Sequence, residues 1–373
     1  MALNLLVINW QDPEHPLAGG AEVHLQEVFG RLVQTFGYRV TLLACSFPHA
    51  APETQIRGIR VLRRGPRNLF NYVVPWVYLR ELAHEPFDFV VEDLNKLPFY
   101  TRFYARQPVV ALLHHFFGKT IYQETSFLPA TYVYWAERSV GKLYRGVPFV
   151  AVSQSSRDDL VRMGIPAQDI RVIYNGTPSD MQPGPARFPD PTVIYLGRLK
   201  RYKRGDRVLK AFAQVRQQLP QARLLVVGDG DARPLLESLA QRLGIAEAVT
   251  FTGFAAADTK RELLQRAWVF VTTSPKEGWG IVSMEAQACG TPAVVWNAPG
   301  LRETVRHGET GFIVESVEET AQRLLEILRN PALRDRLGQA ATRWAHSFSW
   351  DQAAREFHTF FMELKERHPR TPH

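Results

Sequence analysis

The sequence is poor in cysteine and has no long run of apolar residues. Its 373 residues include only two cysteines, Cys45 and Cys289. These are too few and too far apart for a disulfide framework or a cysteine-based zinc site, so a reducing cytosol fits best. No run of about 18 uninterrupted apolar residues occurs, which argues against a segment that spans a bilayer. The first ten residues lack a basic start and a small-residue cleavage site, so we expect a strand there and no secretion signal.

The sequence also lacks a block of like charges. Lysine and arginine number 45 and aspartate and glutamate 37, which gives a net charge of +8. The basic residues are spread along the chain and match no nucleic-acid-binding motif, so we expect no nucleic-acid partner. Attraction to an anionic membrane surface remains open. With 45% hydrophobic and 22% charged residues, the chain is expected to be mostly folded.

Apolar runs alternate with helical patterns along the chain, which is typical of parallel α/β sheets with helices on both faces. A Pro- and Gly-rich segment from 176 to 191 is typical of a linker. We therefore expect two Rossmann-like βαβ domains, residues 1–178 and 179–350, facing each other across a cleft, followed by a helical tail, 351–373. The expected strands are 3–9, 39–44, 87–91, 109–113 and 149–152, then 193–196, 223–227, 249–251, 269–272 and 293–296.

Ligands of open α/β sheets bind beyond the carboxyl ends of the strands, so the loops there hold the candidate site residues. The first such loop contains Gly19 and Gly20, directly before a predicted helix. Glycines at a helix N-terminus let a backbone approach an anion closely, although they also serve a tight strand-to-helix turn. The loop after strand 193–196 holds Arg198 and Lys203, cations suited to a diphosphate unless the loop is simply solvated.

Two carboxylates flank the helix start that follows strand 269–272. Glu277 precedes a helix predicted to begin near Trp279, and Glu285 lies in its second turn. Because a helix N-terminus favours anions, amides from about 278 to 282 are candidates for holding a phosphate between two hydroxyl-binding carboxylates. The alternative is a capping Glu277 and a surface Glu285.

Two histidines, His114 and His115, end the apolar run 108–113 at another strand's carboxyl edge. An imidazole there either donates to a substrate or is a satisfied polar group, and the residues leave open which of the two rings points inward.

These motifs, in this order, resemble the retaining glycosyltransferases of family 4, which have the GT-B fold. The resemblance covers nearly the whole chain. Its motifs are 18–22 (AGGAE), His114, 151–156 (AVSQSS), 172–176 (VIYNG), 197–199 (GRL) with Lys203, 228–230 (GDG), 251–253 (FTG), the Glu-x7-Glu element from Glu277 to Glu285, and 290–292 (GTP).

The resemblance assigns a role to each matching residue. It implies that Arg198 and Lys203 bind the donor diphosphate, that Glu285 binds the ribose and that Glu277 binds the donor sugar. It also implies that Gly20 approaches the diphosphate, that His114 lies near the reacting centre and that the tail helix returns to the first domain. The implied catalytic residues are His114, Glu277, Arg198 and Lys203, and the implied donor-binding residues are Gly19, Gly20, Arg198, Lys203, Gly253, Phe254, Glu277, Gly278, Gly280, Ile281 and Glu285.

The implied activity is transfer of a hexose-type sugar, with retention, from a nucleotide-diphosphate sugar to a hydroxyl acceptor. The acceptor would be a glycan, a lipid-linked group or a small molecule, as in cell wall or polysaccharide biosynthesis. Fixed cations and amides stabilise a departing diphosphate, so no metal and no cofactor is expected. The rival functions are a GT-B module that binds nucleotide or anionic lipid without chemistry, and a sugar epimerase or phosphorylase.

The acceptor side has two candidate segments, 63–76 and 122–135, in which basic and aromatic residues are mixed. Such a mixture suits contact with an anionic membrane, while packing of the aromatics in the core explains it equally well. We expect a cytoplasmic protein, with peripheral contact at the inner membrane face as the open alternative.

Overall fold

A computed structural model describes residues 2–94, 97–184 and 186–367 and divides the chain into two compact units. Unit 1 comprises Met1–Ile121, Phe127–Gly176 and Trp350–His373, and unit 2 comprises Tyr122–Ser126 and Thr177–Ser349. The predicted boundaries at 178 and 350 each differ slightly. Thr177 belongs to unit 2 because its N–H donates to the Phe348 carbonyl at 2.8 Å. Trp350 belongs to unit 1, where its ring packs against His24.

Unit 1 contains an eight-stranded sheet in the order β3-β4-β2-β1-β5-β6-β7-β8, in which only the β3–β4 pair is antiparallel. Its central strand, β1, is fully buried and lies between two parallel neighbours, as its unbroken apolar run predicts. The strands are β1 Asn4–Ile8, β2 Arg39–Ser46, β3 Glu53–Ile56, β4 Ile59–Pro66, β5 Phe89–Asp93, β6 Val109–Leu113, β7 Phe149–Ala151 and β8 Ile170–Val172.

One predicted strand of unit 1 is displaced. The expected strand 87–91 is β5 Phe89–Asp93, because its ladder continues through Glu92 and Asp93, two carboxylates with no exposed surface. Glu92 is satisfied inside the fold, where it accepts hydrogen bonds from the Thr101 N–H and the Tyr144 hydroxyl. Charged residues therefore belong to this buried strand.

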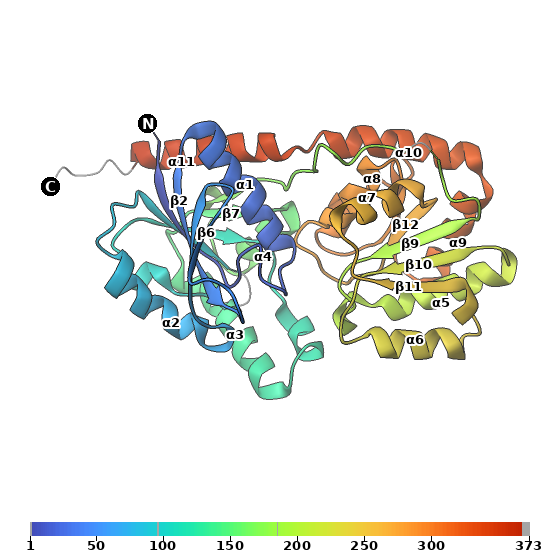
Figure 1. Ribbon diagram of the computed structural model, residues 1–373, viewed down its shortest axis with the longest axis horizontal. Coiled ribbons are helices and arrows are strands. Elements are labelled where there is room, and N and C mark those ends of the chain that lie inside the picture. The colour runs from blue at the N-terminus through green and yellow to red at the C-terminus, as the bar shows by residue number, and fades with distance from the viewer. Residues whose placement is uncertain (1, 95–96, 185, 368–373) are drawn as a thin grey trace. The chain divides into compact units, whose positions relative to one another are not determined.

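Helices cover the unit 1 sheet, and one of them comes from the end of the chain. Helix α11 places an apolar stripe against α1, with the Phe357 ring 6.0 Å from Phe29 and 5.5 Å from His24, and Figure 1 shows α11 beside α1. The Arg31 guanidinium binds Asp351 at 2.6 Å across this contact. The helices of unit 1 are α1 Gly20–Phe36, α2 Phe70–Val77, α3 Phe127–Leu143, α4 Gln154–Arg162 and α11 Trp350–Arg367.

Unit 2 contains a six-stranded parallel sheet in the order β11-β10-β9-β12-β13-β14. Its core lies between this sheet and the helices around it, with Phe212, Leu324 and Val271 fully buried. The strands are β9 Thr192–Leu196, β10 Arg223–Val227, β11 Val249–Gly253, β12 Val269–Thr272, β13 Ala293–Trp296 and β14 Gly311–Val314. The helices are α5 Gly205–Gln218, α6 Arg233–Arg242, α7 Ala257–Arg266, α8 Ile281–Ala288, α9 Val317–Arg329 and α10 Pro331–His346.

Both units are parallel-sheet, Rossmann-like α/β domains, as predicted. The expected linker 176–191 contains no helix, and β9 begins at its end; residue 185 lies outside the described residues.

Candidate functional site

The loops at the carboxyl edge of the unit 2 sheet bring a lysine and a glutamate together. Lys203 follows β9 and Glu277 follows β12. The Lys203 Nζ lies 2.5 Å from the Glu277 Oε1. Both side chains are mostly buried. Burial lowers the pKa of Lys203, but the neighbouring carboxylate outweighs it, so the pKa lies above its ordinary value. A cation held in this way stays charged at neutral pH and presents a fixed positive charge.

Arg198, the other predicted diphosphate ligand, lies on the same loop and is exposed. Its guanidinium forms no hydrogen bond or ion pair with any side chain that the structure describes. This arginine is thus available to a ligand, whereas Lys203 is held by Glu277.

Glycines allow the loops of this edge to pack closely. A Cβ on Gly228 would lie 2.1 Å from the Gly197 carbonyl oxygen, and a Cβ on Gly300 would lie 2.3 Å from the backbone carbonyl oxygen of Glu277. Both distances are far below any real contact, so only glycine fits. The glycines of the 228–230 motif therefore serve the approach of β10 to the loop that carries Arg198.

Helix α8 begins at Ile281, two residues after the predicted start near Trp279. Gly280 caps it with a φ of 84°, a left-handed conformation that interrupts the helix before this point. The N–H groups of Ser283 and Met284 donate to the Gly280 carbonyl, so Ile281 stands at the open end of the helix. First-turn amides have no acceptor inside their own helix, which makes this end suited to an anion.

Glu285 lies in the second turn of α8, as predicted, and is 4% exposed. Its Oε1 accepts a hydrogen bond from Lys260 Nζ of α7 at 2.7 Å, while its Oε2 is buried without a partner among the described residues. Burial raises the pKa of Glu285, and Lys260 opposes that rise. A buried carboxylate oxygen with no donor is an unmet acceptor, which a ligand hydroxyl would satisfy.

Of the remaining unit 2 candidates, Gly253 is the last residue of β11 and Phe254 follows it. Gly253 has a φ of 74° and accepts a hydrogen bond from the Gly228 N–H at 2.8 Å. The Phe254 side chain is 87% exposed, which is unusual for a phenylalanine. Gly278 lies in the loop between Glu277 and Trp279.

A hollow of about 470 Å³ in unit 2 lies elsewhere, between the starts of α5 and α6. Among the residues that line it are Lys200, Arg204, Ala232 and Leu236, and none of the predicted donor-binding residues lines it.

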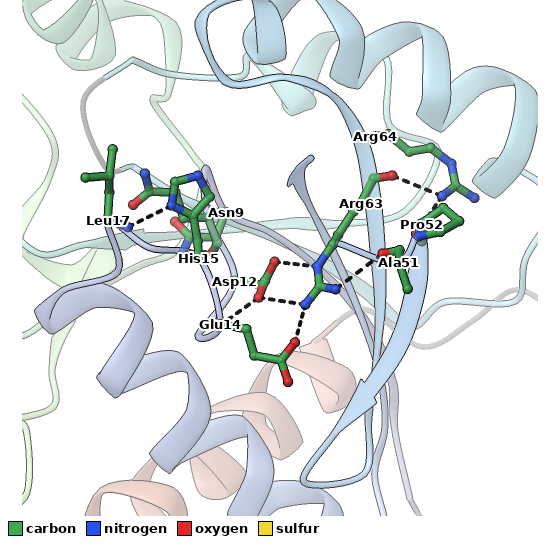
Figure 2. A network of polar contacts seen from close by, with 10 residues as sticks. Asn9, Asp12, Glu14, His15, Leu17, Ala51, Pro52, Arg63 and Arg64 are labelled. Atoms are coloured by element: carbon green, nitrogen blue, oxygen red, sulfur yellow. Dashed lines mark hydrogen bonds and ion pairs between the residues drawn. The ribbon is translucent and has the colours of Figure 1, made fainter. Parts of the chain in front are cut away.

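In unit 1, the predicted glycine loop is held by an unpredicted buried ion pair, which Figure 2 shows. Arg63 of β4 binds both oxygens of Asp12, with Nε to Oδ2 at 2.8 Å, and also binds Glu14 at 2.7 Å. The Arg63 and Asp12 side chains are almost fully buried. The sequence placed Arg63 in the segment 63–76, whose mixed basic and aromatic residues left membrane contact and core packing of the aromatics open. The structure places it inside β4 because Asp12 offers a buried carboxylate.

The loop then enters α1 through Gly19 and Gly20. The Gly19 N–H donates to Glu22 Oε2 at 2.7 Å, and Glu22 Oε1 accepts from Asn9 at 3.2 Å. Burial raises the pKa of Glu22, although the Gly19 N–H opposes it. Glu22 therefore links the end of β1 to the start of the helix.

His114 directly follows β6 and lies 7% exposed in a buried polar cluster. Its Nε2 donates to Asp93 Oδ2 at 3.1 Å, and its ring lies 5.1 Å from that of His24. Burial lowers the pKa of His114, but the attraction of Asp93 outweighs it and the pKa is raised. His115 is half-buried against Phe117, so of the two adjacent histidines His114 is the one that belongs to this cluster.

Sequence analysis missed three members of this cluster. Asp93 ends β5 next to β6, and its Oδ1 is buried without a partner in the described part of the chain. His24 Nδ1 binds Asn175 Oδ1 at 2.7 Å, and burial and the charge of His114 lower the pKa of His24 to about 3. Two acids at the end of the apolar run 89–91 were a signal for Asp93, whereas nothing in the spacing pairs His24 with Asn175 across 151 residues.

Two further features concern ligands and membranes. In the described ranges, no three histidine, cysteine, aspartate or glutamate side chains are grouped so that they would hold a metal ion. No described helix is both long and apolar enough to cross a bilayer.

Comparison with known proteins finds relatives over most of the chain. The profile of the glycosyltransferase family 4 domain matches residues 18–180, and that of glycosyl transferases group 1 matches 178–344. A D-inositol 3-phosphate glycosyltransferase of Rhodococcus opacus is 36% identical over 225 residues, which are 55% of this chain and 50% of that protein. The chain thus spans about half the length of this relative.

A GDP-mannose-dependent alpha-(1-6)-phosphatidylinositol monomannoside mannosyltransferase of Mycobacterium tuberculosis is 28% identical and matches 92% of this chain and 95% of its own length. Sucrose-phosphate synthase from Thermosynechococcus elongatus superposes with a TM-score of 0.83 at 20% identity, over 98% of this chain and all of that one. Anabaena HepE in complex with UDP-glucose superposes with a TM-score of 0.76 at 20% identity, over 97% of this chain and 100% of HepE.

The two profiles together cover residues 18–344, and the superposed structures are GT-B glycosyltransferases. The chain has the GT-B fold and belongs to glycosyltransferase family 4.

Proposed function

We propose that this protein transfers a hexose-type sugar, with retention, from a nucleotide-diphosphate sugar to a hydroxyl acceptor without a divalent metal. The observation that carries the proposal is the pair of lysine–glutamate contacts in unit 2, Lys203 with Glu277 and Lys260 with Glu285. Cations, a helix N-terminus and an unsatisfied carboxylate are grouped at the strand ends where α/β sheets bind ligands.

In the proposed mechanism, Arg198, Lys203 and the first amides of α8 bind the diphosphate and stabilise its negative charge as it departs. Glu277 accepts hydrogen bonds from donor sugar hydroxyls, and Glu285 accepts one from the ribose with its unpaired oxygen. A fixed donor to a developing oxyanion contributes about 3 to 4 kcal/mol to the transition state. The exposed Phe254 ring stacks on the nucleobase.

On the unit 1 side, His114 contacts the donor sugar at the reacting centre, and Asp93 holds its Nε2 as a donor. Gly19 and Gly20 let the loop backbone approach the diphosphate. The departing phosphate accepts the proton of the acceptor hydroxyl. The mycobacterial relative is named for a phosphatidylinositol monomannoside, and we propose a lipid-linked acceptor for this protein too.

The experiment is donor turnover with UDP-, GDP- and ADP-sugars, measured as release of the nucleoside diphosphate, with and without EDTA. We expect one donor to turn over at an unchanged rate in EDTA and Glu277→Gln to abolish most of that activity. Glu262→Gln, an exposed carboxylate on α7, is the control and should keep full activity. The proposal would be refuted if Glu277→Gln turned the donor over as fast as the unaltered protein, or if the donor turned over equally fast without protein.

The stereochemical claim is tested on the product by NMR of its anomeric proton. A product with the donor's anomeric configuration supports retention, and the opposite configuration contradicts it.

A further inference from the structure

Two helices of unit 1 carry apolar residues on their solvent side. Around α2, the residues Leu69, Tyr72, Trp76 and Leu79 recur at helical spacing, and all are exposed. The buried side of the same helix is a separate stripe, Phe70, Val74 and Val77. The exposed stripe is therefore not a misplaced part of the core.

Helix α3 repeats the pattern. Leu128, Tyr132 and Trp135 are spaced at i, i+4 and i+7 and are each at least 49% exposed. The buried positions of α3 are small or turned inward, among them Ala130, Ala136 and Val140. Both helices thus have one face for the core and a second apolar face for something else.

The two exposed stripes form one surface. The Tyr72 hydroxyl lies 3.3 Å from the Tyr132 hydroxyl, which joins the first turn of α2 to the second turn of α3. We call the seven residues the aromatic surface: Leu69, Tyr72, Trp76, Leu79, Leu128, Tyr132 and Trp135. A monomeric protein rarely exposes an apolar patch of this kind without a binding role.

The charges near the aromatic surface that no described side chain neutralises are positive. Arg138 and Lys142 are the exposed charges of α3, because Glu137 is buried and accepts the N–H groups of Phe117 and Gly118. Arg80 lies over the Trp76 ring at 4.5 Å, while the adjacent Glu81 is neutralised by Arg64. The surface therefore presents aromatic groups with a cationic rim.

We propose that the aromatic surface docks the protein on an anionic phospholipid bilayer. Tryptophan and tyrosine side chains favour the headgroup level, and amphipathic helices with basic rims lie in that plane. Arginine and lysine beside them gain from the negative potential of the bilayer surface. The proposal goes beyond the transfer reaction and suits a lipid-linked acceptor, yet the vesicle-binding measurements that test it need neither donor nor acceptor.

The sequence left two roles open for segment 63–76, membrane contact and packing in the core, and different residues of the segment serve each role. In segment 63–76, Arg63 and Arg64 are engaged in internal ion pairs and Phe70 is in the core. Tyr72 and Trp76 of the same segment face solvent. The proposed docking relies on Tyr72 and Trp76 in this segment and on the cations of α3.

The first test is flotation of the full chain with vesicles of phosphatidylcholine containing phosphatidylglycerol, compared with phosphatidylcholine alone. We expect binding to the anionic vesicles, weakened by raising the salt from about 0.1 M to about 1 M, which shortens the Debye length from about 10 Å to about 3 Å. Tryptophan emission should shift to shorter wavelength on binding. Absence of binding, or equal binding to both vesicles, would overturn the proposal.

The second test uses variants. Trp76→Ser with Trp135→Ser should weaken binding by about tenfold for each tryptophan. Arg138→Gln with Lys142→Gln should weaken it by about fivefold for each cation. Val161→Ser on α4 and Lys210→Gln on α5, also exposed, are the matched controls and should bind as the unaltered protein does.

Donor turnover and the melting temperature of each variant establish that it is folded. Full vesicle binding by the tryptophan variant would refute the docking role. A different result would also refute it: the unaltered protein binds no vesicles and sediments as a dimer, and the tryptophan variant sediments as a monomer. The surface would then join two copies of the chain.

Discussion

At the carboxyl edge of the unit 1 sheet, Glu22, Asp93 and His114 are buried. His114 binds Asp93, and Glu22 accepts a hydrogen bond from Asn9, so acids and imidazoles dominate this edge. At the same edge of the unit 2 sheet, Lys203 and Lys260 each bind a glutamate, so lysine–glutamate pairs take the place of the imidazoles. Both edges are built on parallel strands. In the function proposed above, one architecture would therefore support two chemistries: contacts to the donor sugar in unit 1, and phosphate and ribose binding in unit 2.

The two edges also differ in how they are held. The unit 1 loop depends on the buried Arg63–Asp12 pair, whereas the unit 2 loops depend on close glycine contacts and partly exposed ion pairs. Loss of one partner therefore has different consequences in the two units.

The largest effect is expected in unit 1. Arg63→Met leaves the Asp12 carboxylate buried without its partner and should reduce the free energy of unfolding by about 3 to 5 kcal/mol. Denaturant titration measures the loss. Arg60→Met on the same strand breaks only an exposed pair with Glu85 and should cost less than about 1 kcal/mol. Equal losses for the two variants would show that the loop does not depend on the buried pair.

In unit 2 the expected effect is on rate, not on folding. Lys203→Met should lower kcat for donor turnover by about 10² to 10³, because a fixed cation beside the departing diphosphate is lost. Its melting temperature should fall less than that of Arg63→Met, since the Glu277 side chain keeps 19% of its surface exposed whereas that of Asp12 keeps none. Lys210→Met, an exposed lysine on α5, is the control. Unchanged kcat in Lys203→Met would assign this lysine a structural role.

A third prediction concerns acid stability of unit 1. His24 has a pKa of about 3 in the folded protein, so below its ordinary value of 6.5 the unfolded chain binds more protons. Stability from neutral His24 is thus present above pH 6.5 and is lost as the pH falls, by about 2 kcal/mol at pH 5.

His24→Phe keeps the ring contacts with Trp350 and Phe357 but does not titrate. The variant is expected to be less stable than the unaltered protein at pH 7, because the bond to Asn175 is lost, and this deficit should shrink by about 2 kcal/mol at pH 5. A deficit that is constant between the two pH values would contradict the assigned pKa.

The smallest effect is expected at Lys260. Lys260→Met removes the cation that opposes the raised pKa of Glu285, so less of the carboxylate is ionised to accept a ribose hydroxyl. Nucleoside diphosphate affinity should fall about tenfold. Calorimetric titration measures it, and the loss should diminish at higher pH as Glu285 ionises. A pH-independent loss would point to a direct contact of Lys260 with the nucleotide.

The sequence predicted the parts of the fold that follow from unbroken apolar runs. Strands β1, β9 and β12 are buried on both faces and coincide closely with their predicted ranges. Prediction was less accurate where a charged or special residue lies inside an element. Glu92 and Asp93 extend β5, Arg63 lies within β4, and Gly280 delays α8.

The candidate site could be predicted in part, where its residues lie close together in the sequence. Glu277 and Glu285 share one loop and helix, and their spacing places them without knowledge of the fold. The partners that tune them do not share that segment: Lys203 is 74 residues from Glu277 and Lys260 is 25 from Glu285. Periodicity carries no information about such pairs, because they arise from the order in which strands join the sheet.

The most direct test of the account is titration of the protein with UDP-, GDP- and ADP-sugars, followed by thermal unfolding. One nucleotide sugar should raise the melting temperature, since a ligand present at about 100 times its Kd stabilises the native state by about 2.7 kcal/mol. Lys203→Met with Glu285→Gln should abolish that rise. If no nucleotide sugar stabilises the protein, or the double variant is stabilised equally, the unit 2 edge is not a nucleotide-sugar site.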